Sequence, residues 1–516
     1  MWPVRRLVKY GLVGSVLVGG VTSLHANQYN IDSIGVVRLG RSAFTVFKIG
    51  MHYKMELYGK NLDPNSEEYK AQRSKVHREA AEALLDLCRT NKGVYIKVGQ
   101  HIGALDYLVP KEYVETMKVL HSHAPTSSLS DIHRVLQEDL KLNPLSVFEE
   151  IDGEPLGAAS LAQVHRARLK DGTIVAVKVQ HPYVQGNSLV DMKTMEVLVK
   201  IVSWVFPNFK FQWLVDETKR NIPLELDFRL EAENIEKVRR MFSHLSWLKI
   251  PKVYPELSTK RVLTMEFLEG GQVNDLDYIK TKNINPFEVS DKLGQLYSHM
   301  IFIEGFVHSD PHPGNILVRR EPSGQTSLVL LDHGLYATLT NEVRWEYSKL
   351  WLSILNKDKE LMRQHCDKLG VGDLYALFAC MVSGRTWDAI ESGLNKTKFT
   401  VKEKDMFQKE IPNLLPVISE ILARVDRQML LILKTNDLLR GIEHTLQTQS
   451  RMSSFLVMSQ CCVRSVYGEQ LKQCSSSLAR WQTTFLQHWT LLKLSIYYFY
   501  LHVNSLVRGI SVKRLS

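Results

Sequence analysis

The 516-residue chain has few cysteines, and their spacing excludes several classes of protein. Cys461 and Cys462 are adjacent, which makes a poor start for a disulfide framework, and no Cys-x-x-Cys pair is present to bind a metal. We therefore expect mostly buried thiols in a reducing or neutral compartment. The six positions are Cys88, Cys366, Cys380, Cys461, Cys462 and Cys474.

The sequence also lacks internal repeats, low-complexity tracts and clusters of basic and aromatic residues. Lys and Arg number 65 against 55 Asp and Glu, and the two signs are interleaved along the chain. Nucleic acid is therefore not expected as a partner. The net charge of +10 fits an anionic membrane surface or a basic-leaning compartment. Hydrophobic residues make up 44% of the chain, which is enough for a packed globular core.

No acidic residue occurs before Asp32. Basic residues precede an apolar run over 10–24, which is shorter than the ~20 residues that a comfortable membrane-spanning helix needs. The segment 1–26 is compatible with a mitochondrial presequence, a secretory signal or a short membrane anchor. Because it is basic and free of acids, we predict mitochondrial import, with 1–26 as a targeting or anchor segment and the protein associated with a membrane. Leu24 fits a signal-peptidase site poorly, so the secretory route is disfavoured.

Helical periodicity dominates the N-terminal part of the chain. An amphipathic pattern predicts one long helix over 67–91, with Gly93 as a plausible stop. Further helices are expected to about residue 142. Residues 27–143 are therefore interpreted as an all-helical N-terminal extension.

The pattern changes at Pro144, where polar and apolar residues begin to alternate as they do in strands. Lys170, Asp171 and Gly172 form a typical hairpin turn between two such runs. The predicted strands cover 146–153, 161–169 and 173–180.

Helices are expected to follow these strands. The predicted helices cover 188–205 and 213–244, a strand segment lies in "KRVLTMEFLEG", and Asn285-Pro286 has the signature of a helix start. That helix should end at Gly305, and everything beyond Asp332 should be helical. The apolar segment 485–507 is interpreted as a buried core helix rather than a membrane contact, because charged and polar residues interrupt it.

Four polar side chains have the spacing of a phosphotransfer site. In "HSDPHPGNILV", Asp310 and Asn315 reproduce the Asp-x-x-x-x-Asn pattern of kinase catalytic loops, and Asp332 in "LLDHGL" follows a short apolar strand. Lys178 in "VAVKVQ" lies on the third predicted strand, where kinases carry the lysine that contacts phosphate. Carboxylate and amide oxygens are the ligands that Mg²⁺ prefers.

Each of these features alone has an ordinary explanation, such as a solvated lysine, a capping asparagine or the end of a hairpin. Their order along the chain is strand lysine, helix acid, hinge strand, catalytic loop and metal-binding Asp. That order is the one an ATP-dependent phosphotransfer enzyme needs, and the joint coincidence is improbable. We therefore predict that the two loops form a site for ATP and Mg²⁺.

With these motifs the chain resembles the UbiB, or aarF-domain (ADCK), family of atypical kinase-like proteins over about 80–340, and within it most resembles the first aarF-domain-containing kinase branch. "KVGQ" at 97–100 matches the family's KxGQ motif, and "ELD" at 225–227 matches its ExD motif. "LGAASLAQVHRA" matches its alanine-rich nucleotide loop, and the HSDPHPGN and DHG stretches match its catalytic and metal loops.

The resemblance implies a role for each matched residue. Lys178 would contact the α- and β-phosphates and pair with a helix acid. Glu231 is the first candidate for that acid, and Asp227, taken to lie one turn earlier on the same helical face, is the alternative. Asp310 would orient or deprotonate the acceptor. The residues implied to hold magnesium are Asn315 and Asp332, and those implied to read adenine at the hinge are Met265, Glu266, Phe267 and Leu268.

The nucleotide loop departs from that of an ordinary protein kinase. A glycine-rich loop brings backbone N–H groups close to the phosphates because glycine tolerates positive φ. This loop offers mostly alanine, so it should be stiffer and should hold the phosphates differently. Its residues are Gly157, Ala158, Ala159 and Ser160.

Two further departures concern the acceptor. The resemblance implies that the KxGQ motif folds over the active site and that Lys97 meets Glu225 and Asp227, where it would occupy the space that a protein substrate needs. The matched positions beside Lys97 are Gly99 and Gln100. No Ala-Pro-Glu triplet and no long activation segment follow "DHG", so a platform for docking peptides is missing.

Together these features imply an α+β, protein-kinase-like bilobal fold with a small antiparallel sheet in the N-lobe, a helical C-lobe and an all-helical KxGQ extension. We expect a kinase-like core over 144–340 and a helical C-terminal part over 341–516. The predicted function is ATP- and Mg²⁺-dependent action on a small or lipid-like acceptor, or membrane-coupled ATP hydrolysis, in mitochondrial lipid homeostasis. An anionic membrane, for example one containing cardiolipin, is the expected partner. The alternatives are a nucleotide-binding pseudokinase scaffold and a latent protein kinase that the extension inhibits.

Overall fold

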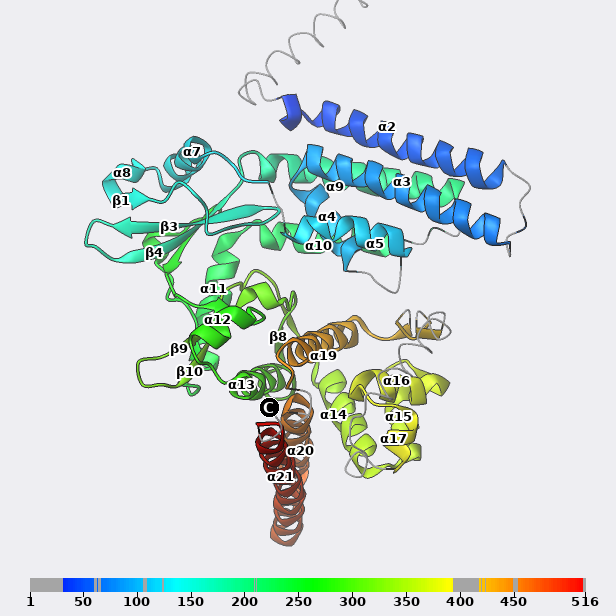
Figure 1. Ribbon diagram of the computed structural model, residues 1–516, viewed down its shortest axis with the longest axis vertical. Helices are drawn as coiled ribbons and strands as arrows, with labels where there is room; N and C mark the ends of the chain where they lie inside the picture. The colour runs from blue at the N-terminus through cyan, green and yellow to red at the C-terminus, as the bar shows by residue number, and fades with distance from the viewer. Residues whose placement is uncertain are drawn as a thin grey trace, which may run out of the picture. The chain divides into compact units, whose positions relative to one another are not determined.

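The computed structural model describes residues 31–392 and 417–513, apart from short gaps at 60–62, 64–65, 105–108, 123–124, 208, 210, 419, 423 and 449–452. The predicted targeting segment 1–26 lies outside the described residues. The chain forms two compact units (Figure 1). The first comprises the chain up to Ala232 together with Val253–Phe267, and the second comprises Glu233–Lys252 and Leu268–Ser516.

The first unit begins with a helical extension. Its longest helix is capped by Ser66, whose side-chain oxygen accepts a hydrogen bond from the Tyr69 N–H at 3.1 Å, and it covers 67–91 as predicted. In Figure 1 this helix, α3, runs alongside α2. The helices are α2 (Gly35–Tyr53), α3 (Glu67–Asn91), α4 (Val94–Gly103), α5 (Lys111–Met117), α6 (Val119–Ser122), α7 (Leu129–Leu140) and α8 (Pro144–Val147).

The sheet of the first unit is antiparallel, with the strand order β1-β3-β4-β6 and with β2 beside β3. Gly172 has φ +88° in the β3–β4 hairpin, a conformation that glycine adopts without strain. The three strands that alternation predicts are confirmed, with slightly shorter bounds. The strands are β1 (Phe148–Ile151), β2 (Gly157–Ala158), β3 (Ala162–Leu169), β4 (Ile174–Gln180) and β6 (Val262–Glu266).

Two helices replace the single helix predicted over 213–244. The carbonyl of Leu226 accepts hydrogen bonds from the side-chain amides of Gln180 at 2.9 Å and Gln185 at 3.0 Å. The Phe228 N–H donates to the carbonyl of Lys260, at 3.0 Å. Backbone groups that a continuous helix would pair internally are therefore used by other elements, and the helix breaks at 226–227. The helices after the sheet are α9 (Val184–Val205), α10 (Gln212–Glu225) and α11 (Phe228–Met241).

The second unit contains two small sheets. One has the order β5-β10-β9-β7, and the other pairs β8 with β11. The expectation that the chain is entirely helical beyond Asp332 is wrong at β11, because its backbone pairs with β8 from Tyr336↔His308 to Thr338↔Phe306. The strands are β5 (Leu248–Lys249), β7 (Gly271–Gln272), β8 (Phe306–His308), β9 (Ile316–Arg320), β10 (Thr326–Leu330) and β11 (Tyr336–Thr338).

Helices make up most of the second unit. The predicted start at Asn285 is confirmed, since its side-chain oxygen accepts a hydrogen bond from the Phe287 N–H at 3.0 Å, and Gly305 at φ +64° follows the last turn. The helices are α12 (Leu276–Thr281), α13 (Pro286–Ser298), η4 (His299–Glu304), α14 (Asn341–Asn356), α15 (Lys359–Lys368), α16 (Tyr375–Ser383), α17 (Trp387–Ser392), α19 (Arg427–Thr445), α20 (Ser453–Gln473) and α21 (Ser477–Lys513).

The exposure of the cysteines and of the last helix can be compared with two predictions about burial. All six cysteines are unpaired thiols, five of them buried, and burial raises the pKa of Cys88, Cys366 and Cys380 to about 12. The prediction of a buried core helix over 485–507 is wrong for most of the residues whose exposure is described, because side chains such as Phe485 and Trp489 of α21 face outward. Among the described helices, none is both long and apolar enough to cross a membrane.

Candidate functional site

Lys178 on β4 meets the first turn of α11 in the first unit. Its ammonium group donates to both carboxylate oxygens of Glu231, at 2.7 and 2.8 Å. The Glu231 side chain is only 3% exposed and that of Lys178 is 17% exposed. A buried carboxylate needs a charged partner, so the two side chains hold one another in place. The helix acid beside the strand lysine is therefore Glu231.

The alternative partner, Asp227, lies elsewhere. The expectation that it sits one turn before Glu231 on the same helix is wrong, because Asp227 lies in the break between α10 and α11. Its carboxylate accepts hydrogen bonds from the guanidinium of Arg229, at 2.9 and 2.6 Å. These bonds, together with the charge of Lys260, lower the pKa of Asp227.

The alanine-rich loop is a tight hairpin. Gly157 and Ala158 form β2 against Val164 and Gln163 of β3, and the Ala159 N–H donates to the carbonyl of Ala162 at 2.8 Å. None of its residues has positive φ, and a Cβ added to Gly157 would meet nothing within 4 Å. The loop therefore keeps this shape without relying on the conformational freedom of glycine.

Residues outside the loop hold it. The His181 imidazole lies 3.0 Å from the carbonyl oxygen of Ala159, and the backbone N–H of His181 donates to the carbonyl of Leu161. Burial lowers the pKa of His181, which keeps the ring neutral. Ser160 at the tip is buried. These contacts restrain the loop, and its stiffness stays a prediction.

The predicted hinge continues from β6. Met265 is buried and pairs with Ala176 of β4, and Glu266, the last residue of the strand, is exposed. The Phe267 ring lies under the guanidinium of Arg166 at 5.8 Å. Leu268 is half-buried, and the chain passes from the first unit to the second between Phe267 and Leu268.

The KxGQ motif lies on α4 and connects the extension to α10. The Lys97 ammonium lies 2.8 Å from a carboxylate oxygen of Glu225, the last residue of α10, and the two side chains are only 11% and 13% exposed. The Gln100 amide donates to the carbonyl of Leu120 at 3.0 Å. The motif thus contributes an ion pair to Glu225 and a side-chain hydrogen bond within the extension.

Gly99 allows the close packing of α4. A Cβ at this position would lie 2.4 Å from Cδ1 of the buried Leu120 and 3.3 Å from Sγ of Cys88. Both neighbours belong to the same hydrophobic cluster as Ile96 and Met117. Glycine is therefore required here for space rather than for backbone conformation.

We expect Gly99→Ala to lower the free energy of unfolding by about 1–3 kcal/mol, since the added methyl group overpacks this cluster. Urea denaturation followed by circular dichroism measures the change. Gly40→Ala in α2 is the matched control, because its Cβ would meet nothing within 4 Å and alanine favours a helix over glycine. An equal loss in both variants would contradict the packing argument.

In the second unit, Asp310 lies in the loop between β8 and β9. Its backbone N–H donates to Nδ1 of the buried His308 at 3.2 Å, and its side chain reaches solvent. Nε2 of His308 lies 2.7 Å from the carbonyl oxygen of Asp332. A carbonyl only accepts, so His308 carries its proton on Nε2 and links the Asp310 loop to the Asp332 loop.

Asn315 lies at the other end of the same loop. Its side-chain amide donates to the carbonyl of Asp310 at 3.4 Å, which directs the amide oxygen away from that carbonyl. The Leu331 N–H donates to the carbonyl of Asn315 at 3.0 Å, so the residue before Asp332 is a direct neighbour of Asn315.

Asp332 is placed by the turn that follows β10. One of its carboxylate oxygens accepts a hydrogen bond from the Gly334 N–H at 2.9 Å. The next residue, His333, is fully buried, lies within hydrogen-bonding distance of Tyr336 Oη and the carbonyl of Leu330, and receives the Asn234 amide on its own carbonyl. Asp332 is half-buried, so its carboxylate stands on a rigid turn with access to solvent.

The donor set fits magnesium that arrives with a nucleotide. In the described part of the chain, no cluster of three or more His, Cys, Asp or Glu side chains could hold a metal ion. Magnesium typically takes one or two protein carboxylates and completes its shell with phosphate oxygens and waters. The carboxylate of Asp332 and the amide oxygen of Asn315 are hard donors of that kind.

Sequence reasoning missed several residues that position these groups. His308 bridges the two loops, and Arg229 takes the carboxylate of Asp227. The signal for His308 is its place two residues before Asp310 in "HSDPHPGN". No local signal marks His181, because its contact with Ala159 joins positions 22 residues apart.

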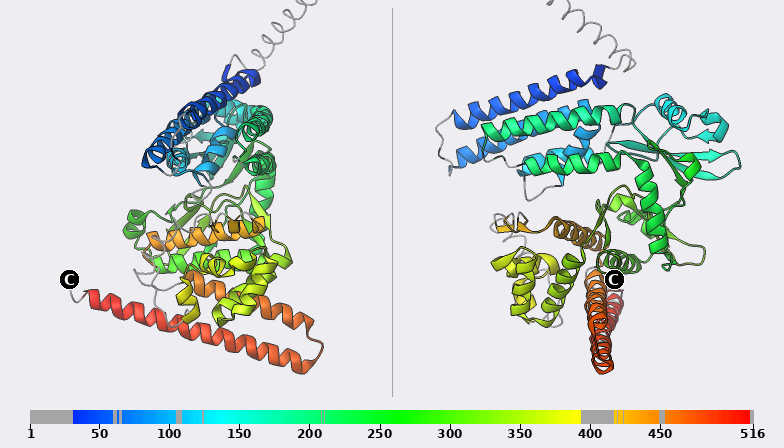
Figure 2. Two further views of the ribbon diagram at one scale, coloured as in Figure 1. Left: turned by 90° about the vertical axis from the view of Figure 1, so that its right-hand side faces the viewer. Right: turned by 180° about the vertical axis from the view of Figure 1, so that it is seen from behind.

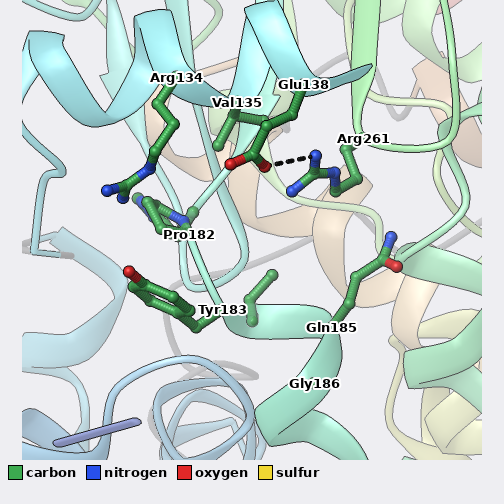
Figure 3. A pocket seen from close by; sticks show the side chains of 10 residues that line it. Arg134, Val135, Glu138, Pro182, Tyr183, Gln185, Gly186 and Arg261 are labelled. Carbon is green, nitrogen blue, oxygen red and sulfur yellow. Dashed lines mark hydrogen bonds and ion pairs between the residues drawn. The ribbon is translucent and has the colours of Figure 1, made fainter. Parts of the chain in front are cut away.

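One cavity in the first unit is lined by His181, which contacts the alanine-rich loop, but by none of the predicted site residues themselves. It measures about 300 Å³ and is bordered by α7 and by the start of α9, with Arg134 and Arg261 among the side chains in Figure 3. Arg261 pairs with Glu138, the contact dashed in Figure 3, and with Asp139, and Arg134 pairs with Asp131. Its arginines are thus engaged by neighbouring acids, and we assign the cavity no role in catalysis.

Known proteins resemble this chain over most of its length. The ABC1 atypical kinase-like domain matches residues 119–366. "AarF domain-containing kinase 1" of Drosophila melanogaster is 57% identical over 501 residues, with 96% of each chain covered. "AarF domain-containing protein kinase 1" of Mus musculus is 49% identical over 94% of this chain and 92% of its own. "ABC1 family protein MCP2" of Saccharomyces cerevisiae is 36% identical over 92% of this chain and 88% of its own. These matches confirm the resemblance, and the chain belongs to the ABC1/aarF family of atypical kinase-like proteins.

Proposed function

We propose that this protein is an ATP- and Mg²⁺-dependent atypical kinase or ATPase that acts at a mitochondrial membrane on a small or lipid-like acceptor. The observation that carries the proposal is the paired state of Lys178 and Glu231, with two hydrogen bonds to a carboxylate that is almost fully buried. A strand lysine and a helix acid joined in this way are what enzymes with a kinase-like fold require.

The roles follow from the chemistry of each group. Lys178, held by Glu231, would contact the α- and β-phosphates. Asn315 and Asp332 would hold magnesium, which supplies charge neutralisation at the phosphates when bound. Asp310 is exposed at its loop, where its carboxylate would orient the acceptor or accept its proton.

Two features favour a small acceptor over a protein. The strand β11 ends at Thr338 and α14 begins at Asn341, so no long segment follows the Asp332 turn. A protein kinase uses a long segment at this point to dock its peptide substrate. In addition, Lys97 and Glu225 form an ion pair that ties the extension to α10. Relatives named as kinases support the kinase-like class without defining the acceptor.

The test is ATP turnover by the full chain, measured as phosphate release, with phosphatidylcholine liposomes that contain or lack cardiolipin. We expect turnover that requires magnesium and rises with cardiolipin. Magnesium–nucleotide binding without any turnover would instead support a nucleotide-binding pseudokinase scaffold. Failure to bind nucleotide at all would contradict both functions.

A latent protein kinase is the remaining alternative. The Lys97→Met variant removes the cation from Glu225, and Ala158→Gly loosens the nucleotide loop. We expect neither variant to transfer phosphate from labelled ATP to a mixture of peptides. Transfer to peptides by either variant, with none by the parent protein, would show that the extension or the loop inhibits a protein kinase.

A further inference from the structure

The last helix, α21, carries large apolar side chains on its solvent side. Figure 2 shows α21 in red as the long final helix of the second unit. It packs along α20. About half or more of the surface of several large side chains is exposed: 66% for Trp481, 55% for Phe485, 48% for Trp489 and 61% for Ile496. The full exposed set is Leu478, Trp481, Phe485, Leu486, Trp489, Leu492, Ile496, Phe499, Tyr500 and Val503, and we call it the apolar stripe.

The stripe follows helical periodicity. Its members recur at intervals of three or four residues, so at 3.6 residues per turn most of them fall on one face roughly 100° wide. The less exposed side is different in composition over 477–496, where every exposure is described: apart from Leu491 and Leu494, it consists of small or polar residues. Those residues are Ala479, Thr483, Thr484, Gln487 and Thr490.

This arrangement is the reverse of an ordinary amphipathic helix in a globular domain. Such a helix buries its large apolar side chains and exposes its polar ones. An exposed apolar face of this extent is typical of a surface that meets a membrane or another protein. We therefore expect the outer face of the helix to contact an apolar environment.

The charges of the segment identify that surrounding. No Asp or Glu occurs after Glu469, whereas α21 contains Arg480, Lys493, Arg508 and Lys513. The ammonium group of Lys493 lies 5.5 Å from the ring centroid of Trp489, beside the stripe, where a long stem can reach an anionic headgroup while the ring enters the acyl boundary. Tryptophan, tyrosine and basic residues are the side chains that prefer the membrane interface.

We propose that α21 lies in the plane of an anionic lipid surface, with the apolar stripe inserted at the boundary between headgroups and acyl chains. A second copy of the chain fits less well, because two acid-free basic helices repel each other and have no acidic side chains for ion pairs between them. The inference rests on the proposed membrane association and names the surface that mediates it, but it does not depend on nucleotide chemistry.

Vesicle flotation of the full chain tests the proposal, with phosphatidylcholine vesicles that contain or lack cardiolipin. The variant Phe485→Gln/Trp489→Gln/Ile496→Gln removes three apolar side chains from the stripe and leaves Leu494, which is buried, in place. We expect it to bind cardiolipin vesicles at least about tenfold more weakly than the parent, since each side chain loses apolar burial in lipid. Binding by the parent should weaken as salt is raised.

The matched control is Leu189→Gln/Val197→Gln/Trp204→Gln on α9, which removes three exposed apolar side chains from the first unit, with Trp204 83% exposed. We expect this variant to bind as the parent does. Equal loss in both variants, or parent-like binding by the α21 variant, would overturn the assignment to α21. Conversion of a dimer to a monomer by the α21 variant, without any change in vesicle binding, would show that a second copy covers the stripe instead.

A measurement on the parent protein keeps the test decisive if the triple variant fails to fold. Brominated lipids should quench the fluorescence of Trp481 and Trp489 when the stripe inserts, and Trp481→Phe/Trp489→Phe should keep vesicle binding while losing that quenching. Unchanged quenching in this conservative variant would overturn the proposal. The Asp332→Asn variant should bind vesicles as the parent does, which separates failure of this inference from failure of the proposed function.

Discussion

The Asp332→Asn variant should lose magnesium-dependent ATP turnover by on the order of a thousandfold, because a neutral amide in place of the carboxylate weakens the hold on the metal that stabilises the developing charge. The carboxylate stands on a turn closed by its own bond to the Gly334 N–H, at 2.9 Å. An Asn side-chain oxygen can accept the same bond, so the turn should survive. Phosphate release at saturating ATP measures the loss, and thermal denaturation should show a melting temperature close to that of the parent.

Asp373→Asn is the control for this change. It makes the same chemical substitution in the same unit, at a carboxylate that is 92% exposed and pairs with Arg363 only at 3.5 Å. Its turnover should match the parent, since an exposed pair of this kind contributes little. If Asp332→Asn keeps most of the turnover, the assignment of Asp332 to the metal site is wrong, and so is the proposed reaction mechanism.

The Arg38→Met variant should lower the free energy of unfolding by about 3–5 kcal/mol, because it leaves a buried carboxylate without its partner. Arg38 of α2 donates to both oxygens of Asp191 on α9, at 2.8 and 2.6 Å, and the two side chains are only 4% and 1% exposed. Urea denaturation followed by circular dichroism measures the loss. The double variant Arg38→Met/Asp191→Leu should recover most of it, since it removes both charges together.

The neighbouring pair of Arg41 and Asp32 provides the control. It joins the same helix to the residues before it at 2.6 Å, but its side chains are 32% and 63% exposed. Arg41→Met should therefore cost about 1 kcal/mol or less. A similar loss in Arg38→Met and Arg41→Met would contradict the argument that burial sets the strength of the Arg38–Asp191 pair.

Local patterns in the sequence determined most of the secondary structure. The helix over 67–91 follows from its periodicity and its Ser66 cap, and the β3–β4 hairpin follows from alternation and Gly172. The spacing of Asp310 and Asn315 and the motif around Asp332 also suffice to predict that these residues lie in two loops that belong to one site. In all of these cases the interacting groups are close in the chain, or the motif itself records the geometry.

Only the tertiary structure decided the features that depend on distant partners. The helix break before Phe228 requires the amides of Gln180 and Gln185 at the carbonyl of Leu226, and helical periodicity carries no trace of them. The choice of Glu231 over Asp227 beside Lys178 depends on that same break.

The orientation of α21 is the other feature that the sequence left open. Apolar periodicity shows that a helix has one face that avoids water, but it does not tell whether that face meets the protein core or a separate apolar surrounding. The sequence by itself therefore determined most of the helices, the hairpin and the residue types of the candidate site. The fold decided which charges meet and which apolar faces stay outside, because burial and pairing are properties of the whole packed chain rather than of any local segment.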